Sequence, residues 1–380
     1  MKKEILDVVK NKKYQWIATV VVFLIILLVG LYIRYQPIST GHLVDETTGD
    51  YTPLALDPYY FLRVSETLVA NNGTLPDFDT MRSPHLDVAW TQEILPQANV
   101  LLFNFLKVFD PSVTLNYADV FSPVLFFALG LIVFFLLSYL LTKSKIVSLF
   151  ASFVLVVIPP YLYRTLAGFS DHEAIGILGF FLALLVFFYG IFFLDKEKKK
   201  KNAKYKIGLV GLLAGIATTF AVVSWGGGAS FLFMILPVAF LVKWFIEERK
   251  NKSNYILFYG AWIIGVILGG ILFNISLTRL VSSYMLGNTG ILTLFALLYF
   301  VAETLTLKYY GKNDFVKKYI ELISIVIVVL ISGILYQIFV GDFFSMIAAL
   351  LNKIIYPFGT ARVAVTVAEN KQPYLTDLTG

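Results

Sequence analysis

Long apolar runs separated by short polar connections make up most of this chain. A helix needs about 20 predominantly apolar residues to cross a bilayer. Runs of this kind lie at 16–35, 118–142, 145–163, 174–194, 206–224, 229–246, 255–273, 285–306 and 319–340. The strand-like alternation of a membrane barrel is absent from the sequence. The pattern predicts an all-α polytopic membrane protein, with a transmembrane domain over residues 1–340 and the start of a further external loop at 341–380.

The composition agrees with this fold class. The 380 residues are 58% hydrophobic and 15% charged, whereas soluble domains carry about 25% charged residues. Cysteine is absent, which excludes a disulfide framework and thiolate chemistry. The first apolar run is too long for a signal peptide and lacks a small-residue cleavage site, so we interpret it as a retained span.

Basic residues occupy alternate connections between the apolar runs. They gather before residue 16 and at 143–145, 196–206, 243–252 and 308–318. The positive-inside rule predicts that these segments, including the N-terminus, lie in the cytoplasm. We expect the membrane to be the plasma membrane. The net charge of +6 thus reflects membrane topology and does not indicate a nucleic-acid partner. The outer face receives the connections 36–117, 164–173, 225–228, 274–284 and 341–380.

The long outer connection 36–117 contains a helical pattern that starts near Asp57. Asp57 is a favourable N-cap, and Pro58 suits the first helical position. The apolar residues that follow favour one face, as in a helix that lies along the membrane surface. Loops of this length within a compact fold usually carry function.

A cluster of ionisable residues lies between two apolar runs, where Arg164 precedes Asp171, His172 and Glu173. At a junction between a loop and a helix, both carboxylates can face one point. The local sequence is equally compatible with helix capping, because Ser170-x-x-Glu173 has capping-box spacing and Asp171 suits the helix dipole. In that interpretation Arg164 is an interfacial anchor, and His172 is more often a hydrogen-bond partner of carboxylates than a metal ligand.

The predicted topology places four acids on the outer face, each beside a span end: Asp57, Asp171, Glu173 and Glu369. Glu369 also has a capping-box spacing from Thr366, but polar residues follow it instead of an apolar run. Three or four hard oxygen ligands suit Mg²⁺ or Mn²⁺. A metal at a membrane surface suits a pyrophosphate leaving group. The pattern therefore indicates group transfer from a lipid-linked donor.

Three motifs resemble those of the catalytic subunit of N-oligosaccharyltransferases, which are membrane glycosyltransferases of the C superfamily. They are Asp57-Pro58-Tyr59-Tyr60-Phe61-Leu62-Arg63, then Arg164 through Gly168 to Asp171-His172-Glu173, and Thr366-Val367-Ala368-Glu369 followed by Asn370-Lys371-Gln372-Pro373. The resemblance implies transfer of an oligosaccharide from a polyprenyl (pyro)phosphate carrier to asparagine in Asn-x-Ser/Thr of an acceptor polypeptide. The second motif ends in Glu173, where the family has Asp, Asn or His.

The resemblance also implies roles for individual residues. Asp57, Asp171 and Glu173 would bind Mg²⁺ or Mn²⁺. Asp57 and Glu369 would hold the acceptor amide nitrogen, and Arg164 would support the catalytic acids. Substrate-binding roles are implied for Glu369, Arg63 and His172.

The family's further C-terminal spans and its soluble acceptor-binding domain, with a Trp-Trp-Asp-Tyr-Gly motif, have no counterpart here. We therefore expect the chain to need the missing C-terminal part of the same protein for full activity. Two alternatives remain open. One is another C-type enzyme that transfers a single sugar from a polyprenyl-phosphate donor. The other is a transporter or structural membrane protein, although no ionisable residue lies at mid-span depth, where transport pathways usually carry them.

Overall fold

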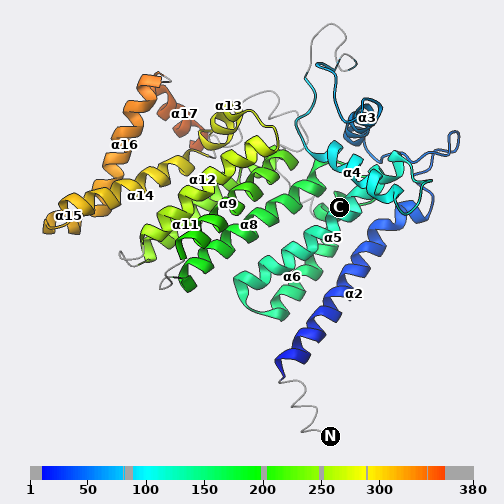
Figure 1. The fold of residues 1–380 in the computed structure, drawn as a ribbon, viewed down its shortest axis with the longest axis horizontal. Coiled ribbons are helices and arrows are strands. Elements are labelled where there is room, and N and C mark those ends of the chain that lie inside the picture. Colours follow the sequence, from blue (N-terminus) through cyan, green and yellow to red (C-terminus); the bar gives the residue numbers. More distant parts are fainter. Residues whose placement is uncertain are drawn as a thin grey trace. The chain divides into compact units, whose positions relative to one another are not determined.

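The computed structural model describes residues 11–79, 81, 89–197, 203–247, 252–287, 290–339 and 341–355, and its regular structure is helical within these ranges (Figure 1). Eight of the described helices are long and apolar enough to span a membrane: Lys12–Ser39, Leu115–Thr142, His172–Leu194, Lys204–Ser224, Gly226–Ile246, Lys252–Leu272, Ile291–Tyr310 and Ile320–Ile338. The predicted all-α polytopic membrane fold is confirmed.

The chain divides into two compact units, residues 1–293 and 294–380. The second unit contains most of α14 (Ile291–Tyr310), then α15 (Asp314–Lys318), α16 (Ile320–Phe339) and α17 (Phe343–Ile355). The prediction of a span at 285–306 placed the helix start too early. The short helix α13 (Leu277–Arg279) and the π-helical turn η2 (Leu280–Met285) come before α14.

The predicted span 145–163 is divided into two helices, α6 (Lys145–Val157) and α7 (Pro159–Tyr163). Ile158 between them is extended, with φ −66° and ψ 121°. The physical cause is Pro159, because a residue before proline is restricted away from the helical region. The stretch predicted as a span at 145–163 is therefore interrupted at Ile158.

The divided segment nevertheless runs the length of a span beside α2 (Lys12–Ser39). Near its start, Lys145 Nζ lies 3.4 Å from Gln15 Oε1. Just past its end, Thr165 Oγ1 accepts a hydrogen bond of 2.7 Å from Arg34 Nε. The stretch of α2 from Gln15 to Arg34 is about 28 Å long at 1.5 Å per residue, which is close to the hydrocarbon thickness of a bilayer.

Glycines allow close helix packing at the centre of the first unit. Helices α5 (Leu115–Thr142), α8 (His172–Glu197), α9 (Ala203–Ser224) and α12 (Lys252–Leu272) lie side by side there (Figure 1). A Cβ atom added at Gly215 of α9 would lie 2.2 Å from Trp262 O, and one added at Gly265 of α12 would lie 2.3 Å from Leu212 O. Small residues let membrane helices approach this closely, so larger side chains are excluded from this contact.

Helices α3 (Leu56–Ala70) and α4 (Leu95–Lys107) belong to the long connection 36–117 and pack at one end of the first unit, against α5 (Figure 1). The predicted helix near Asp57 is confirmed, but Asp57 as its N-cap was wrong. The N-cap is Ala55, which is extended and makes no side-chain capping bond. Pro58 is tolerated because the first N–H groups of a helix have no intrahelical partner. The carboxylate of Asp57 is thus not used for capping.

Candidate functional site

A cavity of about 610 Å³ opens at the end of the first unit that carries α3 and α4. Its lining draws on the predicted outer connections 36–117, 164–173, 225–228 and 274–284. The charged and titratable residues in the lining include Asp57, Glu93, Asp171, His172, Arg279 and Tyr284. These four connections therefore converge at one end of the unit, as the alternation of charges predicts. The motif with Glu369 lies outside the described residues.

Asp171 is fixed at the start of α8 and is only 4% exposed. Its Oδ1 accepts a hydrogen bond of 2.7 Å from the backbone N–H of His172. Its own N–H donates to Phe169 O at 2.9 Å. Arg164 Nη1 lies 4.0 Å from its Oδ2. The carboxylate is thus held by backbone and charge from two sides while one edge faces the cavity.

The capping box expected between Ser170 and Glu173 is not formed. The hydroxyl of Ser170 donates to Asp119 Oδ2 on α5. Glu173 Oε1 instead pairs with Arg164 Nη1 at 3.0 Å. The capping interpretation of these two side chains was therefore wrong, because Ser170 bonds to another helix and Glu173 pairs with Arg164 of the same connection.

His172 is held between two aromatic rings with one nitrogen directed at carboxylates. Its ring stacks on Trp225 at 5.9 Å with an interplanar angle of 21°, and it meets Phe61 edge-on at 5.9 Å. Its Nδ1 lies 3.0 Å from Glu93 Oε2 and 3.6 Å from Asp171 Oδ1. His172 is therefore a hydrogen-bond partner of the acids in this structure.

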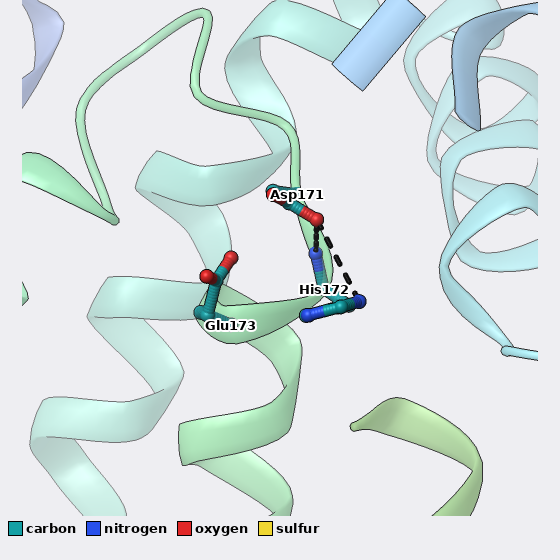
Figure 2. A group of neighbouring side chains, drawn as sticks. All are labelled: Asp171, His172 and Glu173. Atoms are coloured by element: carbon teal, nitrogen blue, oxygen red, sulfur yellow. Dashed lines mark hydrogen bonds and ion pairs between the residues drawn. The ribbon is translucent and has the colours of Figure 1, made fainter. Parts of the chain in front are cut away.

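Asp171, His172 and Glu173 also form a possible metal-ligand group. Each offers one ligand atom, and these atoms lie within 4.8 Å of one another. Figure 2 shows the three side chains spreading from the start of α8. Among the residues that the structure describes, Glu173 Oε2 is buried without a hydrogen-bond partner, so it offers an acceptor that a cation could satisfy. Glu173 is not among the residues that line the cavity, and its other oxygen is paired with Arg164.

Asp57 contributes to the same cavity from α3. It is exposed, it lines the cavity, and among the described residues its carboxylate has no hydrogen-bond or ion-pair partner. Asp57 and Asp171 together supply two carboxylates to one space, and Glu93 supplies a third. This donor set fits a hard divalent cation, which prefers carboxylate oxygens.

Arg63 makes a buried contact beside the cavity and does not line it. Its Nη1 donates to Asp79 Oδ1 at 3.0 Å and its Nη2 to Asp79 Oδ2, while Asp79 is 1% exposed. The hydrogen bonds to Asp79 raise the pKa of Arg63. The guanidinium also lies 5.1 Å from the ring of Trp90, which lines the cavity. This pair therefore joins α3 to the segment that follows it within the connection 36–117, and substrate binding by Arg63 stays a prediction.

Two cavity residues were not identified from the sequence. Glu93 is one acid among many in the connection 36–117, and nothing local marks it. Arg279 is the one arginine or lysine among the described residues that line the cavity, and its Nη1 donates to Gln92 Oε1. A signal existed for Arg279, since it is the sole charged residue of the connection 274–284, which the sequence predicts to face outward.

Comparison with known proteins identifies this arrangement. A family model described as oligosaccharyl transferase STT3, N-terminal, matches residues 19–359. The chain is 27% identical over 296 residues to a dolichyl-phosphooligosaccharide-protein glycotransferase of Methanocaldococcus jannaschii, covering 68% of this chain and 31% of that protein. It is 29% identical over 211 residues to dolichyl-phosphooligosaccharide-protein glycotransferase 2 of Archaeoglobus fulgidus, covering 54% of this chain and 30% of the relative. The chain thus spans about a third of the length of these relatives.

Solved structures share the fold at low sequence identity. The archaeal oligosaccharyltransferase AglB from Archaeoglobus fulgidus, in complex with an inhibitory peptide and a dolichol-phosphate, superposes with a TM-score of 0.69 at 18% identity, covering 96% of this chain and 43% of that one. The A. fulgidus oligosaccharyltransferase in complex with Zn and sulfate gives a TM-score of 0.62 at 19% identity, over 89% of this chain and 43% of the other. A further structure of that enzyme is tethered to an acceptor peptide containing the NVT sequon and has a TM-score of 0.63 at 18% identity, over 86% and 38% of the two chains.

Proposed function

Because the chain belongs to the oligosaccharyl transferase STT3 family, we propose that it forms the membrane part of an enzyme that transfers an oligosaccharide from a polyprenyl (pyro)phosphate carrier to asparagine in Asn-x-Ser/Thr. The observation that carries this proposal is the cavity in which Asp57 and Asp171, from separate outer connections, face one space. Relatives named as dolichyl-phosphooligosaccharide-protein glycotransferases support the donor class.

The proposed cofactor is Mg²⁺ or Mn²⁺. Asp57 and Asp171, which both line the cavity, would hold it. Glu173, two residues after Asp171, would offer its Oε2, which has no hydrogen-bond partner among the described residues. A cation bound here supplies positive charge to the phosphate of the leaving carrier. The Zn and sulfate complex of the A. fulgidus enzyme supports cation binding in this fold, and it does not identify the metal.

Different residues of this chain would act on the two substrates. The acceptor nitrogen forms a bond to the first sugar carbon as the bond from that carbon to the phosphate oxygen breaks. The carboxylate of Asp57, which has no partner in the part of the chain that the structure describes, can accept a hydrogen bond from the acceptor amide and later its proton. Arg279 lines the same cavity and offers a guanidinium to the phosphate, a pairing that its planar fork suits. Roles for Glu369, Arg63 and His172 in substrate binding are part of this proposal.

The proposed location is the plasma membrane, with the N-terminus in the cytoplasm and the cavity at the outer face. The support is the lysine-rich alternate connections together with the gathering of the other connections around one cavity.

The experiment is a transfer assay with a polyprenyl-linked oligosaccharide and a fluorescent Asn-x-Thr peptide, in membranes that contain the chain together with the acceptor-binding part that it is expected to need. We expect Mn²⁺-dependent glycosylation that a chelator removes and added Mn²⁺ restores. A matched Gln-x-Thr peptide serves as the control acceptor. Equal modification of both peptides, or transfer that persists without divalent cations, would exclude the proposed reaction.

A further inference from the structure

Next to the cavity lies a buried carboxylate that the proposed chemistry does not use. Asp119 of α5 is 0% exposed. Its Oδ1 accepts a hydrogen bond of 2.6 Å from Asn99 Nδ2 on α4, and its Oδ2 accepts one from the hydroxyl of Ser170. Asn99 and Ser170 are also fully buried. Burying a carboxylate is costly unless it is hydrogen-bonded, and here both oxygens have a donor.

These contacts join three elements next to the site. Asn99 belongs to α4, Asp119 to the first turns of α5, and Ser170 directly precedes Asp171. The following residue of α5, Val120, accepts a hydrogen bond of 2.7 Å from the N–H of Gly168. Gly168 has a φ of +87°, a conformation that glycine adopts at little cost. The start of α5 therefore makes two hydrogen bonds to the connection 164–173, one to Gly168 and one to Ser170, immediately before Asp171.

Asp171 itself has few contacts that fix it to other elements. Its backbone N–H bonds within the same connection, to Phe169, and its Oδ1 bonds to the next residue, His172. The hydroxyl of Ser170 on one side and the ring of His172 on the other are the side chains next to Asp171 in sequence that join it to other elements, Ser170 through Asp119 and His172 through Glu93. Asp119 is not among the residues that line the cavity, so it acts at a distance of one intervening residue.

We infer that Asp119 is a positioning residue that acts through Ser170 to hold the carboxylate of Asp171 in the cavity. The inference rests on the proposed function insofar as Asp171 binds a cation. Partners of this kind, which orient a metal ligand without touching the metal, typically change metal affinity about 10-fold to 100-fold when removed.

Four single variants separate the contact from general destabilisation. Ser170→Ala removes the hydroxyl, and Asp119→Ala removes both acceptors. Asp119→Asn keeps one acceptor for Ser170 and offers an amide to Asn99 Oδ1, which is buried without a partner. The matched control is Ser122→Ala. Ser122 lies on the same helix and is fully buried, and its hydroxyl has no hydrogen-bond partner among the described residues.

Two measurements on the purified chain test the inference. Amide hydrogen exchange of residues 164–173 reports whether the connection is held. We expect it to become about tenfold faster in Ser170→Ala and Asp119→Ala, because a hydrogen bond to a carboxylate is lost. The Mn²⁺ dissociation constant, from electron paramagnetic resonance of free Mn²⁺, should rise about 10-fold in both variants. Asp119→Asn should recover most of each change, and Ser122→Ala should match the wild type.

Unchanged exchange in both Ser170→Ala and Asp119→Ala would overturn the inference, and so would wild-type Mn²⁺ affinity in both. If Ser122→Ala changed amide exchange and Mn²⁺ affinity as much as Ser170→Ala does, the effect would come from general packing. That result would also overturn the inference. If the wild-type chain binds no Mn²⁺, the metal part of the proposed function fails. The exchange data then decide alone whether Asp119 holds the connection. Should Asp119→Ala fail to fold, Ser170→Ala and Asp119→Asn provide the same comparison.

Discussion

The two carboxylates that face the cavity are held in very different ways. Asp171 is 4% exposed, bonded to the backbone of His172 and flanked by Arg164. Asp57 is exposed at the first turn of α3, and no described residue bonds to its carboxylate. Asp171 is thus held in place by its neighbours, whereas Asp57 presents a carboxylate that no described residue binds.

The difference separates two functions of an active-site acid. A ligand that is fixed by its neighbours contributes geometry, because little reorganisation is needed when a cation binds. A free carboxylate contributes an acceptor that an incoming group can occupy. We therefore expect substitutions on the Asp171 side to affect both structure and activity, and substitutions of Asp57 to affect activity alone.

Replacing Asp171 should have the largest effect. Asp171→Ala removes a proposed cation ligand and the acceptor of the first N–H of α8. We expect glycan transfer to fall about 100-fold or more and stability to fall by about 1 kcal/mol from the lost cap. Asp171→Asn keeps an acceptor for the His172 N–H and should lose transfer but retain the thermal midpoint. A fully active Asp171→Asn variant would contradict a role for the charge.

Replacing Asp57 should remove transfer with no loss of stability. We expect Asp57→Ala to reduce the transfer rate about 100-fold and to leave the thermal midpoint in detergent unchanged, because its carboxylate has no partner among the described residues. Glu66→Ala is the matched control, since Glu66 is an exposed acid of the same helix that does not line the cavity. Equal effects of the two substitutions would show that net charge on α3, and not Asp57, matters.

Arg164 should have an intermediate effect. Its Nη1 lies 3.0 Å from Glu173 Oε1 and 4.0 Å from Asp171 Oδ2, so it keeps two carboxylates at fixed positions. We expect Arg164→Ala to lower transfer about tenfold through misplaced ligands. Arg164→Lys keeps the charge without the planar fork and should recover part of that loss. An Arg164→Ala variant with the wild-type rate would show that Asp171 is held without it.

A substitution at Gly176, which packs against Trp225, should have the smallest effect on transfer. A Cβ added at Gly176 of α8 would lie 2.3 Å from Cβ of Trp225, whose ring stacks on His172. We expect Gly176→Ala to destabilise the protein by about 1 to 3 kcal/mol through overpacking, measured by denaturant titration in detergent. Gly208→Ala is the control, because nothing lies within 4 Å of an added Cβ there. Equal stability of the two variants would mean that Trp225 moves freely.

The sequence predicted the fold and part of the site for identifiable physical reasons. The bilayer sets the length of a membrane span and the side on which lysines gather. The apolar runs and the lysine positions therefore predicted the helices and the common end at which the connections 36–117, 164–173, 225–228 and 274–284 meet. The break at Ile158 was visible as Pro159-Pro160 but was overridden by the apolar run around it. The local capping patterns misled at Ser170, because its actual partner lies on another helix.

The residues that the sequence did not reveal depend on tertiary contacts. Glu93 reaches His172 only after the connection 36–117 folds back over the cavity. Asp119 sits at the polar start of an apolar run, where an acid looks like a boundary residue, and its partners Asn99 and Ser170 come from separate elements. Glu369 lies outside the described residues, and its role stays a prediction.

The central claim is that Asp171, which is held by its neighbours, and Asp57, which is not, bind one cation together. Electron paramagnetic resonance of Mn²⁺ titrated into the purified chain tests it directly, with Asp57→Ala, Asp171→Asn and the control Glu66→Ala beside the wild type. We predict one tight Mn²⁺ site in the wild type and in Glu66→Ala, with affinity lost in both Asp57→Ala and Asp171→Asn. Wild-type affinity in either of those two variants would contradict a shared site.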